Sequence, residues 1–156
     1  CQPSELRILN RLQPGMSLGT YHVSTNPTKQ FHRFDTHLIS DPLDWYRQAS
    51  PWGESVSAPC TVIEYLWAYP MQGLQPYVGD SVGLFGAIEI GFDHGPFLLN
   101  QAYRLESRVL CVGQSPQTEY VWYETEAFNS DNQRVVSMLM QSRVMKVSSA
   151  EYANTL

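Results

Sequence analysis

The chain has 156 residues, a formal net charge of −5, and a composition that is 43% hydrophobic and 16% charged. A domain of this length can bury an adequate core, and the composition excludes a disordered chain, so residues 1–156 are treated as a single domain. Ten Lys and Arg residues without a cluster argue against binding to nucleic acid or an anionic membrane surface, and no run of 18 apolar residues could span a bilayer.

The first part of the chain mixes short elements with loops. An amphipathic turn or short helix is expected over residues 1–12, and a strand over residues 18–23. Residues 29–39 fit a helix face but also contain residues that favour a strand. Residues 40–57 have no regular period and are predicted to form a long ordered loop, which in a compact domain is more often functional than filler.

A buried helix is predicted over Ser57–Tyr69. Ser57 can cap this helix, and Pro59 suits its first turn, where a missing N–H has no cost. The stretch is apolar on nearly every side, which is typical of a buried helix. Glu64 is its only charged residue, and Pro70 is expected to end it.

Four long strands are predicted after this helix, following a second loop. Apolar residues alternate along each of them, and an Asx-rich hairpin turn joins the last two. The predicted loop spans residues 70–83, and the predicted strands span residues 84–92, 98–112, 118–128 and 134–147.

The predicted order is therefore a short strand, a loop, one buried helix and an antiparallel meander of long strands. Long strands wrapped around one central helix make the α+β arrangement called the hotdog fold. One such unit leaves a sheet edge unpaired, and exposed edges are usually covered. We therefore expect either a homodimer or a second hotdog domain as the partner.

The segment Phe34-Asp-Thr-His-Leu-Ile-Ser-Asp-Pro-Leu-Asp-Trp-Tyr46 and the residues after it resemble the MaoC-like group of enoyl-thioester hydratases and dehydratases. That family has a Gly-Asp-x-Asn-Pro-x-His segment, a glycine-rich bend and an Ile-Ala-His/Pro step into the hotdog helix. Asp41 matches the aspartate, and Tyr46 stands where the histidine would be. Ser50-Pro-Trp-Gly53 resembles the glycine-rich bend, and Val56-Ser-Ala-Pro59 resembles the step into the helix. His94-Gly-Pro-Phe97 resembles the start of a later strand of the family.

The resemblance implies dehydration, hydration or related acid–base chemistry on an acyl-thioester or polyketide-like small molecule. In the family, an Asp/His pair orients a water, and a backbone N–H at the start of the buried helix polarises the thioester carbonyl. Two departures are visible: no histidine follows Asp41 at the family's spacing, and Leu43 and Asp44 replace Asn-Pro. The chain therefore resembles the degenerate half of a double-hotdog protein, or a homologue with reassigned chemistry, more than a standard hydratase.

The candidate catalytic residues are Asp41, Tyr46, His37 and His94. Histidine is the side chain that titrates near neutral pH without perturbation, which suits a general base. Asp93 precedes His94 and could orient its imidazole. The alternative for each residue is an ordinary turn, core or surface position.

The candidate substrate-binding residues are Trp52, Gly53, Ser57 and Glu64. Glu64 either faces a ligand pocket or pairs with a cation, because a carboxylate in an apolar stretch needs a partner or a raised pKa. The arginines expected as its structural partners are those of the sheet, Arg104, Arg108 and Arg143.

No metal and no cofactor are expected, because no set of His, Cys, Asp and Glu recurs at ligand spacing. The three cysteines, Cys1, Cys60 and Cys111, show no disulfide spacing either. Cys60 and Cys111 are expected to be buried thiols, which favours a reducing compartment such as the cytoplasm.

Three hypotheses for function follow. The chain is a hotdog lyase, a non-catalytic hotdog half that scaffolds a catalytic partner, or a cone-shaped cyclase or isomerase of the nuclear-transport-factor-like type. A cone places its helices before all long strands and keeps an open internal cavity. A hotdog wraps its helix and has its pocket at a dimer interface.

Overall fold

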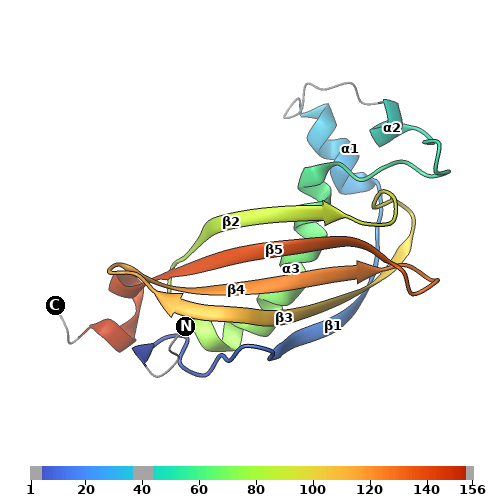
Figure 1. Cartoon of the computed structure of the whole chain (residues 1–156). Coiled ribbons are helices and arrows are strands. Elements are labelled where there is room, and N and C mark those ends of the chain that lie inside the picture. The colour runs from blue at the N-terminus through green and yellow to red at the C-terminus, as the bar shows by residue number, and fades with distance from the viewer. Residues whose placement is uncertain (1–4, 37–43, 154–156) are drawn as a thin grey trace.

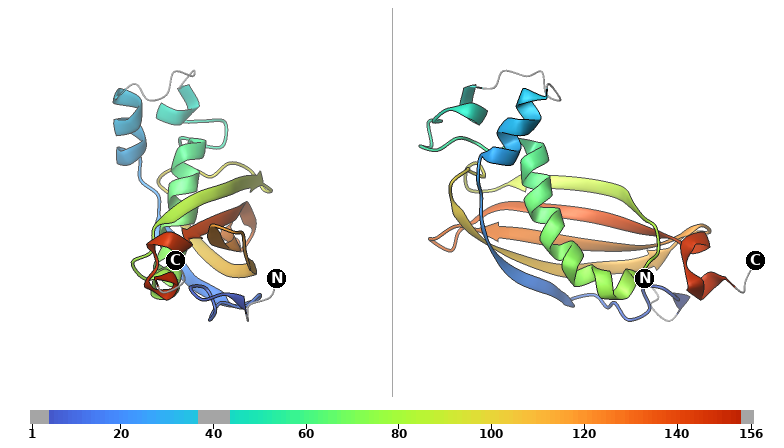
Figure 2. Two further views of the ribbon diagram at one scale, coloured as in Figure 1. Left: turned by 90° about the vertical axis from the view of Figure 1, so that its left-hand side faces the viewer. Right: turned by 180° about the vertical axis from the view of Figure 1, so that it is seen from behind.

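The computed structural model describes residues 5–36 and 44–153. A five-stranded antiparallel sheet curves around one long helix, α3 (Pro59–Val78), as Figure 1 shows. Two short helices, α1 (Thr28–Asp35) and α2 (Asp44–Arg47), lie beyond the start of α3 in both views of Figure 2. The strands are β1 (Ser17–Ser24), β2 (Gly83–Phe92), β3 (Ala102–Gln114), β4 (Thr118–Phe128) and β5 (Arg134–Met145), in the order β1-β3-β4-β5-β2.

This arrangement confirms the predicted α+β architecture with one central helix. It also shows that the cone hypothesis is wrong, because β1 precedes α3 and the space between helix and sheet is filled. Tyr123 and Phe97 have no exposed surface there. No helix in the described part of the chain is long and apolar enough to cross a membrane.

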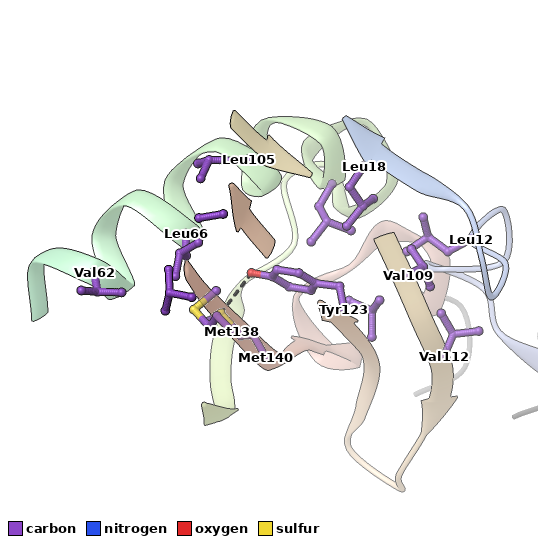
Figure 3. Packing of buried hydrophobic residues seen from close by; sticks show 14 of the residues in the cluster. Leu12, Leu18, Val62, Leu66, Leu105, Val109, Val112, Tyr123, Met138 and Met140 are labelled. Carbon is purple, nitrogen blue, oxygen red and sulfur yellow. Dashed lines mark hydrogen bonds between the residues drawn. The ribbon is translucent and has the colours of Figure 1, made fainter. Parts of the chain in front are cut away.

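α3 packs on the concave face of the sheet through a single stripe of residues spaced four apart. Such a stripe lies on one face of a helix, so the sheet buries that face and no other. Opposite it, Tyr123, Met138 and Met140 are fully buried, and the Tyr123 hydroxyl donates to Met140 Sδ at 3.0 Å (Figure 3). The remaining sides of α3 are mostly half-buried, so burial on all sides is not achieved within one chain. The stripe consists of Val62, Leu66, Pro70 and Leu74.

The helix is longer than predicted. It continues through Pro70 and Pro76 to Val78, although Pro70 was expected to end it. A proline inside a helix removes one hydrogen bond and bends the axis, and α3 curves toward its C-terminal end in Figure 2. The burial of Pro70 in the core stripe offsets part of that loss. Gly73 allows a close approach to β1, because a Cβ there would lie 2.1 Å from the Leu18 carbonyl oxygen.

β2 forms one edge of the sheet, and its register shifts between Phe85 and Ala87. Ile88 and Phe92 pair with core residues of β5 and share the concave face with Phe85, whereas Leu84 pairs with Arg143 on the convex face. The alternation predicted along residues 84–92 would put Leu84 and Ile88 on one face. They lie on opposite faces, because the irregularity at Gly86 inserts one residue between them.

The cysteines differ from expectation in one respect. Cys60 is a free, half-buried cysteine, but Cys111 is disulfide-bonded. The expectation of a free thiol at Cys111 is wrong, and the argument for a reducing compartment loses that support.

Residues 5–12 form turns, which is one of the two conformations expected there, and a buried carboxylate explains why they do not form a helix. Glu119 on β4 has no exposed surface. Its two oxygens accept hydrogen bonds of 2.6 to 3.2 Å from the N–H groups of Arg7, Ile8 and Leu9 and from the Tyr152 hydroxyl. These bonds replace the backbone bonds of a helix and fasten both ends of the described chain to the sheet.

Replacing Glu119 with Gln should lower the free energy of unfolding by about 2–3 kcal/mol, because the amide offers a donor where several donors converge. Denaturant unfolding of the variant measures this loss. The matched control is Glu106→Gln, since Glu106 is an exposed glutamate on the sheet. Equal stability of the two variants would contradict the anchoring role.

Candidate functional site

At the start of α3, some backbone N–H groups donate hydrogen bonds within the described residues and one does not. Ala58 is the N-cap, and no side chain caps the helix, so the predicted capping by Ser57 is wrong. The Ser57 N–H donates to the Phe97 carbonyl at 2.7 Å, and the Ala58 N–H donates to Gln30 Oε1 at 2.8 Å. The Cys60 N–H has no acceptor among the described residues. It is therefore the free backbone donor at the positive end of the helix dipole.

Buried side-chain donors near the same end are also unused. Ser57 and Thr61 are 2% and 1% exposed, and their hydroxyls have no hydrogen-bond partner among the described residues, nor does Nη1 of Arg33. A buried polar group without a partner costs about 1–3 kcal/mol, so each one calls for an explanation such as a water or a ligand. We call the Ser57 and Thr61 hydroxyls together with the Cys60 N–H the α3-start donors.

The link between β2 and β3 runs beside these donors. Val56 and Leu98 form an isolated antiparallel bridge, and the Leu99 N–H donates to the Ser55 carbonyl at 2.8 Å. Phe97 on this link stacks on Tyr103 of β3, with the two ring centroids 4.2 Å apart. Because Phe97 also accepts from Ser57, the link fixes the backbone immediately before α3.

Gln30 is the residue at this site that sequence reasoning missed. It is fully buried, and its amide joins three segments. Nε2 donates to the carbonyls of Tyr46 and Val56 at 2.8 and 3.0 Å, while Oε1 accepts from Ala58. The signal in the sequence was a polar glutamine on the apolar face of residues 29–39, a segment whose pattern did not decide between helix and strand. Through Gln30, α2 is held against the start of α3.

Glu64 ties α1 to α3. It forms ion pairs with Lys29 at 2.7 Å and with Arg33. A structural pairing of Glu64 was expected, but with the sheet arginines, and these have other partners: Glu106 for Arg104, Glu124 for Arg108 and Gln141 for Arg143. Burial would raise the pKa of Glu64, yet the hydrogen bonds and charges of Lys29 and Arg33 outweigh it, so the pKa is lowered.

Of the predicted catalytic residues, the structure describes Tyr46 and His94. Asp41 and His37 lie outside the described residues. Tyr46 is half-buried on α2, with its ring 6.0 Å from Phe34. His94 is exposed, and its Nδ1 lies 2.9 Å from the Arg134 carbonyl oxygen.

The orientation predicted for His94 is not formed, because Asp93 pairs with Arg134 at 2.8 Å. The bend residues are exposed: Trp52 stands edge-on to Trp45 with ring centroids 5.8 Å apart. Gly53 has φ +103°, which suits the tight turn closed by its hydrogen bond to the Ser50 carbonyl. No group of metal-ligating side chains occurs in residues 5–36 and 44–153.

An apolar pocket of about 480 Å³ lies between the second half of α3 and strands β2 and β5. The substrate-binding residues predicted from the sequence include Trp52 and Ser57, at the loop over residues 40–57 and the helix start, and this pocket lies farther along the helix. Its apolar lining comes from α3, β2, β4 and β5. The main lining residues are Trp67, Met71, Leu74, Phe85, Val121 and Val144.

No protein-family model matches the chain, and no curated protein matches it. Solved structures do match. A monoamine oxidase regulatory protein from Archaeoglobus is 14% identical, with a TM-score of 0.68 over 88% of this chain and 93% of that one. The HadBC (3R-hydroxyacyl-ACP dehydratase) complex from Mycobacterium tuberculosis is 17% identical, with a TM-score of 0.65 over 83% and 96%. A MaoC-like dehydratase from Rhodospirillum rubrum is 14% identical, with a TM-score of 0.59 over 88% and 95%.

Other matching structures include a hot-dog-like protein, a thioesterase superfamily member and (R)-hydratases. The chain has the hotdog fold. At these identities the likeness shows the fold and not the activity. It agrees with the resemblance to MaoC-like proteins, and hotdog proteins of this set include dehydratases, hydratases and subunits of complexes.

Replacing Glu64 with Gln should destabilise the protein at neutral pH by about 1 kcal/mol, since one half-buried carboxylate loses its charge pairing with two cations. The lowered pKa means that the carboxylate stabilises the fold above its unfolded pKa and loses this effect as the pH falls through its folded pKa. The difference between wild type and variant should therefore start to shrink near the ordinary value of 4.5 and vanish only below the lowered pKa of the folded protein. Thermal unfolding at a series of pH values measures it, and a difference that persists in acid would contradict the pairing as its cause.

Proposed function

We propose that this chain is a hotdog lyase subunit that binds an acyl thioester at the start of α3 and supports its hydration or dehydration. The observation that carries the proposal is the set of α3-start donors. A free N–H at the positive end of a long helix is suited to a carbonyl oxygen that gains negative charge, because fixed donors in a water-poor site need no reorganisation. The Cys60 N–H takes that role.

The proton transfers fall to the loop before α3. In the hydration direction, the Asp41 carboxylate takes a proton from water, and the resulting hydroxide adds to the β-carbon of the enoyl group. The enolate formed at the thioester then receives a proton at its α-carbon, from Tyr46 or from His37. Tyr46 is attached to the site through Gln30, which binds its carbonyl and the Ala58 N–H.

Asp41→Asn and Tyr46→Phe should each lower the turnover of crotonyl and longer enoyl thioesters by about 10²–10⁴-fold, the usual range for a lost general acid or base. His37→Ala tests the histidine alternative in the same assay. The matched control is His22→Ala, since His22 is exposed on β1, away from the helix start. Unchanged rates in all three site variants would remove the acid–base proposal.

The second candidate is a non-catalytic hotdog half. One observation favours it: within the described residues, the two carboxylates next to the candidate histidines are engaged by arginines. Asp93 pairs with Arg134, and Asp35 pairs with Arg47. On this hypothesis a partner supplies the catalytic pair, and Asp41→Asn has no effect on the activity of the complex.

Whether this chain is a lyase or a non-catalytic half, we propose that a second hotdog unit pairs with its sheet edge, and that this unit is an identical chain. β2 is an edge strand, and its concave face leaves Phe85, Phe92 and Ile88 62%, 51% and 39% exposed. Unpaired backbone groups beside exposed apolar side chains favour pairing with another strand. A twofold axis beside β2 pairs this strand with itself in antiparallel fashion and covers both concave faces at once.

Ile88→Lys should convert the dimer to a monomer, because it places a charge in the middle of the concave β2 face. Ala87→Lys is the control, since residue 87 lies on the convex face of the same strand. Sedimentation or size-exclusion with light scattering measures the mass. A wild-type chain that is monomeric at micromolar concentration would overturn the homodimer and leave a different hotdog chain as the partner.

A further inference from the structure

Gln30 on α1 joins the two parts of the proposed site. One N–H of its amide donates to the Tyr46 carbonyl on α2 at 2.8 Å, and Oε1 accepts the Ala58 N–H at the start of α3 at 2.8 Å. The other N–H donates to the Val56 carbonyl at 3.0 Å. Two carbonyl oxygens and one N–H face the amide, so only this orientation of the amide satisfies all three. Because Gln30 has no exposed surface, bulk water competes for none of these bonds.

The helix that carries Gln30 is itself anchored to α3. Gln30 and Phe34 are one turn apart on α1 and are both buried. Lys29 and Arg33, on the same helix, form ion pairs with Glu64 of α3. Apolar burial and two ion pairs therefore hold α1 beside the start of α3, where Figure 2 shows it. The amide of Gln30 extends from a helix whose position is already set.

The bond to Ala58 also sets the direction of the Cys60 N–H. Ala58 is the N-cap of α3, and Pro59 follows it. Proline restricts its own φ to about −65°, so little backbone freedom separates the two N–H groups. Fixing the Ala58 N–H therefore fixes the Cys60 N–H two residues later. On the other side, the Val56 N–H donates to the Trp45 carbonyl at 2.8 Å, which holds α2 by a second bond.

We propose that Gln30 is a positioning residue for the lyase reaction. It holds Tyr46 and the Cys60 N–H at one separation, so that a thioester bound by this N–H lies within reach of the proton-transfer groups. A misplacement of about 1 Å caused by a residue remote from the chemistry can lower the rate about 100-fold. The inference rests on the proposed function for the roles of Tyr46 and Cys60, and it adds the residue that sets their relative position.

The first test is the steady-state turnover of crotonyl-pantetheine. Gln30→Met keeps the length of the side chain and removes all three hydrogen bonds, so kcat should fall about 10–100-fold while KM changes less than about threefold. Gln30→Asn keeps the amide but shortens the side chain by one methylene, and it should show the same split where Gln30→Met does not fold. The matched control is Gln141→Met, which should keep kcat. Gln141 is also a buried glutamine, but it pairs with Ala87 on the convex face of the sheet, opposite to α3.

A double-mutant cycle separates positioning from a general loss of stability. Tyr46→Phe removes a group that Gln30 positions, so the losses in kcat from Tyr46→Phe and Gln30→Met should not multiply in full. The double variant should be at least about threefold more active than the product of the two losses predicts. In the Gln141→Met background, Tyr46→Phe should cause the same fold-loss as in wild type.

The infrared stretch of a bound thioester carbonyl tests the Cys60 N–H separately. Butanoyl-pantetheine labelled with ¹³C at the carbonyl is suitable, because a saturated thioester is not turned over. A hydrogen bond from a fixed donor polarises the carbonyl, so its stretch should lie below the solution value when it is bound to wild type. In Gln30→Met the stretch should return toward the solution value.

The outcomes separate the positioning role from the lyase. Wild-type turnover with full kcat in the Gln30 variants overturns the positioning role and leaves the lyase standing. A loss that Gln141→Met shares, losses that multiply in full in the cycle, or a carbonyl stretch that stays low in Gln30→Met also overturn it. A low stretch that Gln30→Met reverses supports it even where no enoyl thioester is turned over. If wild type neither turns over crotonyl-pantetheine nor lowers the carbonyl stretch, the proposed function is overturned, and the inference with it.

Discussion

The structure depends on one contact, the stripe of α3 that packs on the concave face of the sheet. Val62, Leu66, Pro70 and Leu74 lie four residues apart and are buried together. This spacing gives a narrow strip on one side of the helix, and the flanks of an otherwise apolar helix remain half-buried. The strip also lies over the middle of the sheet, so the edge strand β2 extends past the helix. The unpaired edge and the apolar pocket are both consequences of this geometry.

Polar contacts hold the helix in place where apolar packing is absent. At its start, the amide of Gln30 uses three hydrogen bonds to join Tyr46, Val56 and Ala58. This satisfies one donor that the helix cannot satisfy itself, while Pro59 has no N–H to satisfy. The Cys60 N–H is then left free for a ligand. A fixed backbone is what makes such a donor useful, because its orientation is set before the ligand arrives.

Sequence patterns predicted the strands well, since alternation along each strand reports directly which face is buried. The fourth strand has the predicted bounds, Thr118–Phe128. Errors arose where distant contacts override local preference. Core burial of Pro70 permits a proline within α3. The choice between a turn and a helix at residues 7–9 also depends on a distant contact, because Glu119 binds the N–H groups of these residues. Gln30 could not be recognised as the centre of the site, because its three partners come from segments that only the fold brings together.

The two flanks of α3 have different surroundings, and this difference links assembly to ligand binding. On the β1 side, Tyr69 and Tyr65 pack against Tyr21 and Phe97. On the β2 side, Trp67 packs against the exposed ring of Phe85 on the edge strand of the sheet. The pocket and the free edge of β2 therefore share a wall. A partner that pairs with β2 covers the concave face leading to the pocket, and a ligand that binds the assembled form more tightly favours assembly by the same free energy.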